Sequence, residues 1–275
     1  MFISKKPIVA IIKLSGIISS ESRLGGRGSL NLNDLSDSIT KAFSYKNIKA
    51  VLILVNSPGG SPVQSALIAN RICELSKEKE VPVYCFIEDL AASGGYWLSC
   101  AADKIYAMES SIIGSIGVIS SGFGAVEALK KLGIERRVYS EGKNKGLLDP
   151  FLPEKKEDID QIKTIQKDLH NQFISWVKKR RGKRLKAKDT ELFNAGIWSG
   201  VKSKELGLID GIGDYYSVMK STFGDDIKFK DFSKKTSWIK QRFFSSKVNF
   251  YNEANIVNAF IDSVEEKIIW SKYGF

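Results

Sequence analysis

Continuous apolar runs that alternate with amphipathic stretches are the feature that most limits the fold of this chain. Three runs are short, rich in β-branched side chains and almost free of charge, at residues 7–13, 48–55 and 81–87. Stretches with helical character lie between and after them, at 34–44, 62–76 and 93–102. Strands joined by helical crossovers run parallel and are buried on both faces. The sequence therefore predicts an α/β protein with a parallel sheet under helices.

The second half of the chain is predicted to continue this pattern with shorter elements. After a loop-like segment at 141–153, a long amphipathic helix is expected at 154–181. The basic, aromatic composition from residue 228 onward predicts a division into a domain at 1–227 and a C-terminal extension at 228–275. The other expected elements are an edge strand at 104–108, a strand at 112–119, a helix at 124–132 and a strand at 134–139.

The charge balance favours an anionic partner. The chain holds 42 basic and 31 acidic residues, a formal net charge of +11, which suits nucleic acid or a lipid surface. It has neither zinc-finger spacing nor an RNA-binding aromatic signature, so a nucleic-acid partner is not expected. Part of the excess lies in the basic run at 178–181, which is interpreted as a solvated helix face.

The cysteines and the N-terminus indicate a chain in a reducing compartment. Cys73, Cys85 and Cys100 have apolar neighbours and no metal-ligand spacing, so we expect reduced, buried thiols and no metal or other cofactor. The apolar run after Pro7 is interrupted at Lys13, far short of the roughly 20 residues that span a membrane. Neither a signal peptide nor a transmembrane segment is therefore expected, and the predicted location is cytoplasmic or peripheral on a membrane.

Glycine-bearing turns follow three of the apolar runs. They contain the sequences Asn-Ser-Pro-Gly-Gly at 56–60, Ser-Gly-Gly at 93–95 and Gly-Ser-Ile-Gly at 114–117. Glycine lets a backbone amide approach a ligand closely, and amides aimed at one point form an oxyanion hole. Each turn alone is typical of an ordinary tight turn; the three together favour a catalytic site around the hydroxyl of Ser93.

A serine nucleophile needs a base, and His170 is the only histidine of the chain. It lies in the middle of the amphipathic stretch and is interpreted as a partly exposed helix residue, so a Ser-His-Asp triad has little support. A neutral lysine can serve instead when burial lowers its pKa from about 10.4. Lys143 and Lys145 lie in the loop at 141–153, where a lysine is ordinarily solvated.

The glycine turns, taken in order, resemble those of the signal peptide peptidase (protease IV) family of serine proteases. The resemblance rests on the three turn sequences and on Trp-Ser-Gly at 198–200 followed by Leu-Gly-Leu-Ile-Asp-Gly-Ile-Gly at 206–213, and it spans residues 7–224. It implies a Clp-protease/crotonase-like fold with repeated ββα-type units, a Ser-Lys dyad and no cofactor. The activity it implies is hydrolysis of extended, apolar peptides such as remnant signal peptides, through an acyl-enzyme.

The resemblance also assigns roles to individual residues. Ser93 matches the nucleophile, and Lys145 matches the general base in the family's context of a lysine five residues before a proline. Lys143 is the weaker candidate. The remaining matches are Ser115 as a hydroxyl that orients the lysine, the amides of Gly60 and Gly94 as the oxyanion hole, and Gly59 as the residue that shapes the turn.

Two departures from the family's pattern bear on assembly. Many members carry an N-terminal membrane anchor, and none is expected here. The longest members hold two tandem copies of the fold, and a single copy is expected here. Because serine and lysine of short members meet across neighbouring subunits, the resemblance implies a homo-oligomeric ring.

Two other functions stay open at this stage. One is a crotonase-like acyl-CoA hydratase or isomerase, which would recruit Glu88 and Asp89. The other is a non-catalytic scaffold whose basic C-terminal region contacts an anionic membrane through lysines, arginines and interleaved aromatic residues.

Overall fold

The computed structural model describes residues 6–20, 29–142, 144–233 and 267–274. They belong to two compact units. The first unit joins Met1–Ile116 to Trp176–Phe275, and the second is Gly117–Ser175. Within the described residues, no helix is both long enough and apolar enough to span a membrane.

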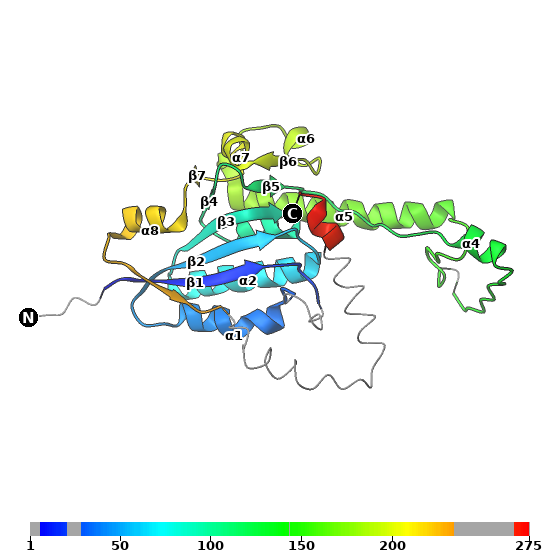
Figure 1. The fold of residues 1–275 in the computed structure, drawn as a ribbon, viewed down its shortest axis with the longest axis horizontal. Coiled ribbons are helices and arrows are strands. Elements are labelled where there is room, and N and C mark those ends of the chain that lie inside the picture. The colour runs from blue at the N-terminus through cyan, green and yellow to red at the C-terminus, as the bar shows by residue number, and fades with distance from the viewer. Residues whose placement is uncertain (1–5, 21–28, 143, 234–266, 275) are drawn as a thin grey trace, which may run out of the picture. The chain divides into compact units, whose positions relative to one another are not determined.

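An eight-stranded, mostly parallel sheet forms the centre of the first unit (Figure 1). Its main path runs β6-β5-β3-β2-β1-β8, with β4 paired to β3 and β7 paired to β4. Among the strands that the structure describes, only β5 and β6 pair antiparallel. The strands are β1 (Ile8–Ser15), β2 (Ile48–Ser57), β3 (Val83–Ala92), β4 (Lys104–Ala107), β5 (Ile112–Gly114), β6 (Ile197–Ser199), β7 (Gly211–Ile212) and β8 (Lys228–Asp231).

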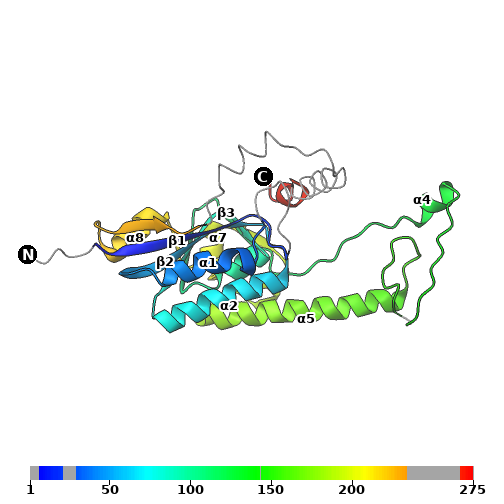
Figure 2. The ribbon, with the colours of Figure 1, turned by 90° about the horizontal axis from the view of Figure 1, so that it is seen from below.

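Helices cover both faces of this sheet. α1 (Leu32–Phe43) and α2 (Pro62–Lys79) lie on one face, and α8 (Tyr215–Phe223) lies on the other (Figure 2). Side chains of Asn31, Ser61 and Asp214 accept hydrogen bonds from the first turns of these three helices, which fixes where each helix begins. The remaining helices of this unit are α3 (Gly94–Ser99), α6 (Asp189–Leu192), α7 (Gly200–Leu206) and the 3-10 turn η1 (Gly182–Arg184).

Burial on both faces explains the continuous apolar runs of the central strands. In β2, all six residues from Ala50 to Val55 are buried. Leu52 and Leu54 pack with Phe86 of β3 and Met219 of α8, which forms the core on the α8 side. The expected parallel α/β fold is confirmed.

Three expectations for the strands need correction, and one further strand was not expected. Residues 104–107 form a strand that is paired on both sides, to β3 and to β7, so it is not an edge. The strand expected at 112–119 ends at Gly114, and residues 134–139 form no strand and are exposed. The sequence Lys-Phe-Lys-Asp at 228–231 forms β8 beside β1, although its alternating charges gave no strand signal. These residues therefore belong to the sheet, while the domain division at 227 stays a prediction.

The second unit contains two helical segments joined by loops and turns. It holds α4 (Val126–Lys131) and the first part of α5 (Lys156–Arg181), whose last six residues belong to the first unit. Two contacts join the segment around α4 to the loop before α5. Arg136 forms an ion pair with Asp149 (2.9 Å), and the Ala125 N–H donates to the Pro150 carbonyl (2.7 Å).

Candidate active site

The three glycine-bearing turns meet at one edge of the sheet. They follow β2, β3 and β5, which are adjacent and parallel, so their carboxyl ends point the same way. In open parallel sheets this edge is where ligands bind. The structure therefore brings together the serine and the glycines that the sequence singled out.

Ser93 occupies a strained backbone position directly after β3. Its φ and ψ are 51° and −121°, a combination that residues with a side chain rarely adopt. The Ser93 N–H donates to the carbonyl of Gly114 (2.8 Å), and its own carbonyl accepts from Trp97 N–H (3.0 Å) at the start of α3. Bonds from a neighbouring strand and from the following helix thus hold the sharp turn. Such a turn presents the hydroxyl at the end of the strand, as in known strand-to-helix nucleophile turns.

Gly59 lies against this turn so closely that no side chain fits. A Cβ atom on Gly59 would lie 2.8 Å from both the Ser93 Cβ and the Gly94 nitrogen, and the residue has a φ of 102°. The turn after β2 therefore packs directly on the turn after β3. This contact is what the expected turn-shaping role of Gly59 requires.

The amides of Gly60 and Gly94 have no hydrogen-bond acceptor within the described ranges of the chain. Ile18 forms a parallel bridge with Gly60, in which the Ile18 N–H donates to Gly59 and the Ile18 carbonyl accepts from Ser61, each at 2.8 Å. Because those two bonds use the flanking residues, the Gly60 N–H points to the other side. Gly94 is the first residue of α3, whose N–H has no partner within the helix. Neither amide donates to any residue that the structure describes.

Ser115 is placed beside Ser93 by the strand register. Ala92 of β3 pairs with Gly114 of β5, so Ser93 and Ser115 are the next residues on neighbouring strands. Ser115 also has a positive φ (52°), and its N–H donates to the Gly196 carbonyl (2.7 Å). Both serine side chains are half-buried.

Lys145 belongs to the second unit and is exposed. It lies in consecutive turns, with its N–H donating to the carbonyl of Gly142 (3.1 Å). Ser93 lies in the first unit, so the meeting of the two side chains stays a prediction. Lys143 falls outside the described residues, and His170 is half-buried in α5, in keeping with its interpretation as a helix residue.

The thiols offer no alternative nucleophile at this edge. Cys85 and Cys100 are buried and free, and Cys73 is half-buried and free. Burial raises the pKa of Cys100 to about 12 and raises the pKa of Cys85 further, so both are neutral at physiological pH.

Contacts between α3 and the end of α5 were missed by the sequence analysis. The basic run at 178–181 is only partly solvated. Arg180 donates to the carbonyls of Cys100 (2.7 Å) and Ala101 (2.9 Å), just beyond the end of α3. Trp176 Nε1 donates to the Trp97 carbonyl (3.0 Å). The helix that begins after Ser93 is therefore held at its far end by α5.

Comparisons with known proteins match most of this chain to peptidases and to one protein with another name. The model of peptidase family S49 matches residues 75–223. The chain is 42% identical over 275 residues to a Brucella melitensis protein named as a Na(+)/H(+) antiporter, covering 97% of this chain and 37% of that protein. It is 36% identical over 207 residues to a putative signal peptide peptidase of Enterococcus faecium, covering 74% of this chain and 60% of the relative. The chain thus spans between about a third and three fifths of these relatives.

A solved structure has a similar fold. It is a lysine-to-alanine mutant of the 1510-N membrane-bound stomatin-specific protease in complex with a substrate peptide, with a TM-score of 0.54 and 15% identity. The match covers 88% of this chain and 99% of that one. The Clp-protease-like α/β fold expected from the sequence is confirmed.

Proposed function

The chain belongs to peptidase family S49, and from that premise we propose that it is an endopeptidase in which Ser93 is the nucleophile and Lys145 the general base. The observation that carries the proposal is the strained turn at Ser93, packed against Gly59 and beside two amides without an acceptor among the described residues. A fold keeps such strain where the geometry serves a function. Family membership favours this reaction over the acyl-CoA chemistry that Glu88 and Asp89 would have served.

The proposed reaction proceeds through an acyl-enzyme. Neutral Lys145 accepts the hydroxyl proton of Ser93, whose oxygen attacks the carbonyl carbon of the scissile peptide bond. The carbonyl oxygen becomes an anion, and the N–H groups of Gly60 and Gly94 stabilise it. The tetrahedral intermediate collapses as Lys145 gives its proton to the leaving amine. Water, deprotonated by Lys145, then attacks the ester and releases Ser93.

Lys145 can act as a base only if its amine loses contact with water, and in the single chain its side chain is exposed. We infer that a neighbouring subunit covers it. Support comes from the apolar surface of the second unit, where Phe123 is 95% exposed, Tyr139 92% and Ile119 79%. Large apolar side chains that are exposed to this extent mark an interface where they form one contiguous patch. The proposed active form is a homo-oligomer.

The proposed substrates are extended apolar peptides, with remnant signal peptides as the example that the Enterococcus relative's name suggests. An extended peptide can add as a strand beside the turns at Ser93 and Gly60, since main-chain hydrogen bonds then hold it regardless of sequence.

Covalent labelling tests the proposal directly. Intact mass would be measured after incubation with a fluorophosphonate probe for the wild type, Ser93→Ala and Lys145→Ala. We expect one adduct on the wild type, none on Ser93→Ala, and a labelling rate at least about 100-fold lower for Lys145→Ala. Lys143→Ala is the matched control and should label like the wild type. An adduct retained on Ser93→Ala, or equal losses from both lysine variants, would contradict the assignment.

A further inference from the structure

Ser57 is a fully buried polar residue at the end of β2, directly before the turn that carries Gly59 and Gly60. Its exposed fraction is 0%. It pairs with Ala91 of β3, two residues before Ser93. A hydroxyl is rarely buried unless a hydrogen bond compensates for the loss of water. The contacts of this side chain are therefore the guide to its role.

The Ser57 hydroxyl holds the turn after β2 through a buried hydrogen bond. Its Oγ accepts from the Gly59 N–H (3.2 Å). Serine side chains in turns commonly bond to the backbone two residues further on. The Gly59 carbonyl is held as well, because it accepts from the Ile18 N–H (2.8 Å). Both backbone polar groups of Gly59 are thus fixed by hydrogen bonds.

The orientation of Gly59 sets the direction of the Gly60 N–H. The Gly59 carbonyl and the Gly60 N–H belong to one trans peptide unit, in which the two groups point in opposite directions. Glycine has no Cβ atom to restrict its backbone, and φ is 102° at Gly59 and 138° at Gly60. Hydrogen bonds at Gly59 are therefore what keeps the Gly60 N–H aimed at one point.

Ser57 also contacts the start of α3, which carries the second proposed oxyanion donor, Gly94. A Cβ atom on Gly95 would lie 2.4 Å from the Ser57 carbonyl oxygen and 3.2 Å from the Ser57 Cβ. Gly95 therefore packs on Ser57 with no space for a side chain. One buried residue thus touches both turns whose amides are proposed to bind the oxyanion.

We propose that Ser57 is a positioning residue for the oxyanion hole: its hydroxyl, through Gly59, keeps the Gly60 N–H directed at the carbonyl oxygen of the substrate. This inference rests on the proposed function, because it concerns the same reaction. Stabilisation of a developing charge depends on donors that are oriented before the reaction begins. Loss of the Ser57 hydroxyl should therefore slow the chemical step and leave the binding of the peptide unchanged.

Inactivation kinetics separate the chemical step from binding. The assembled full chain is incubated with acetyl-Ala-Ala-Leu diphenyl phosphonate, from which a serine oxygen displaces phenoxide at phosphorus while negative charge develops on the phosphoryl oxygen. The dependence of the rate on probe concentration gives the maximal rate, kinact, and the concentration for half-maximal rate, KI. For Ser57→Ala we expect kinact to be about tenfold lower than in the wild type, since outright removal of an oxyanion donor costs roughly a hundredfold. KI should not change.

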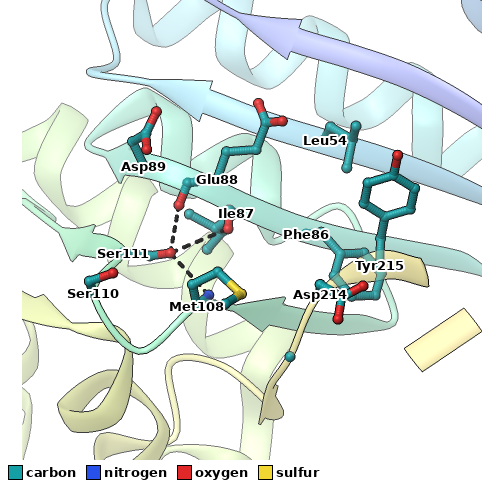
Figure 3. Close-up of a pocket in the computed structure, with 11 residues that line it drawn as sticks. Leu54, Phe86, Ile87, Glu88, Asp89, Met108, Ser110, Ser111, Asp214 and Tyr215 are labelled. Carbon is teal, nitrogen blue, oxygen red and sulfur yellow. Dashed lines mark hydrogen bonds between the residues drawn. The ribbon is translucent and has the colours of Figure 1, made fainter. Parts of the chain in front are cut away.

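Ser111 provides the matched control (Figure 3). It is 2% exposed, and its hydroxyl accepts from the Met108 N–H (3.0 Å) and donates to the Glu88 carbonyl (2.5 Å). Ser111 thus resembles Ser57 in its burial and in holding a turn, but neither of these partners belongs to a glycine-bearing turn. Ser111→Ala should lower the midpoint of denaturant unfolding at least as much as Ser57→Ala, because it leaves two buried groups unpaired. Its kinact should equal that of the wild type.

The pH dependence of kinact gives a second readout. The rate should fall at low pH as the proposed base becomes protonated. The midpoint of this fall should be the same in the wild type and in Ser57→Ala, because the hydroxyl acts on the oxyanion and not on the base.

Four results would overturn the positioning role. They are a wild-type kinact in Ser57→Ala, an equal loss of kinact in Ser111→Ala, a change confined to KI, and a shifted pH midpoint. The second would make the loss an effect of stability, the third would assign Ser57 to peptide binding, and the fourth would assign it to the base. If the wild type itself formed no adduct, the proposed function would be rejected, and the positioning role with it.

Discussion

At the scale of single residues, the backbone conformation of Ser93 predicts how substitutions at this position change the free energy of unfolding. Its φ of 51° and ψ of −121° cost free energy for any residue with a Cβ atom, but little for glycine. Ser93→Gly should therefore have a free energy of unfolding about 1 kcal/mol higher than Ser93→Ala, although both lack the hydroxyl. Denaturant titration would measure the difference.

Ser221 provides the control with the opposite sign. It lies on the exposed side of α8 with ordinary helical neighbours. There Ser221→Gly should be less stable than Ser221→Ala by about 1 kcal/mol. If the glycine variant were less stable than the alanine variant at both positions, the turn at Ser93 would store no strain.

At the scale of elements, a buried ion pair joins α5 to the segment before β7. Arg181, 2% exposed, donates to Asp210 (2.7 Å) and to the Gly207 carbonyl (3.0 Å). Burial alone would raise the pKa of Asp210, but the hydrogen bond and charge of Arg181 outweigh it, so the pKa lies below its ordinary value. Removing one partner of such a pair leaves the other charge buried and unpaired.

This pair predicts a pH-dependent difference in stability. A carboxyl whose pKa is lowered by folding stabilises the protein above the unfolded pKa of about 4, and that stabilisation is lost as the pH falls. Asp210→Asn should therefore lower the free energy of unfolding by about 3 kcal/mol at pH 7. The difference in free energy of unfolding between this variant and the wild type should become smaller below about pH 4. Asp37→Asn, at an exposed surface pair, should show a difference near zero throughout. If the difference in free energy of unfolding between Asp210→Asn and the wild type did not change with pH, the lowered pKa of Asp210 would not be the source of the stabilisation.

The same elements show what the sequence could and could not predict. The strands β1, β2 and β3 and their glycine turns were predictable, because burial on both faces requires continuous apolar runs and sharp turns require glycine. The role of Arg181 was not, because its partner lies 29 residues further along the chain and only the fold brings them together. Residues 134–139 include β-branched side chains but have no neighbouring strand to pair with. Their strand propensity therefore gave a wrong prediction. β8 forms despite its charged sequence because β1 lies beside it and pairs with it.

At the scale of the whole molecule, the proposed site depends on how subunits meet. Ser93 lies in one compact unit and Lys145 in the other, and the second unit exposes several large apolar side chains. If Lys145 of one subunit serves Ser93 of its neighbour, a subunit with only one of the two residues can still complete a site with a partner that has the other. Oligomers of identical chains allow such mixed sites.

Mixing two inactive variants tests this arrangement. Ser93→Ala and Lys145→Ala, each inactive alone, would be dissociated, combined in equal amounts and reassembled. Random mixing pairs an intact serine with an intact lysine in about a quarter of the sites, so about a quarter of the wild-type labelling by the fluorophosphonate probe should return. The adduct should lie only on chains that carry the lysine substitution, which intact mass distinguishes. The wild type, dissociated and reassembled in the same way, should recover its labelling. If it does and the mixture stays unlabelled, both residues of each site lie in one chain. The exposed apolar side chains of the second unit would then need another explanation.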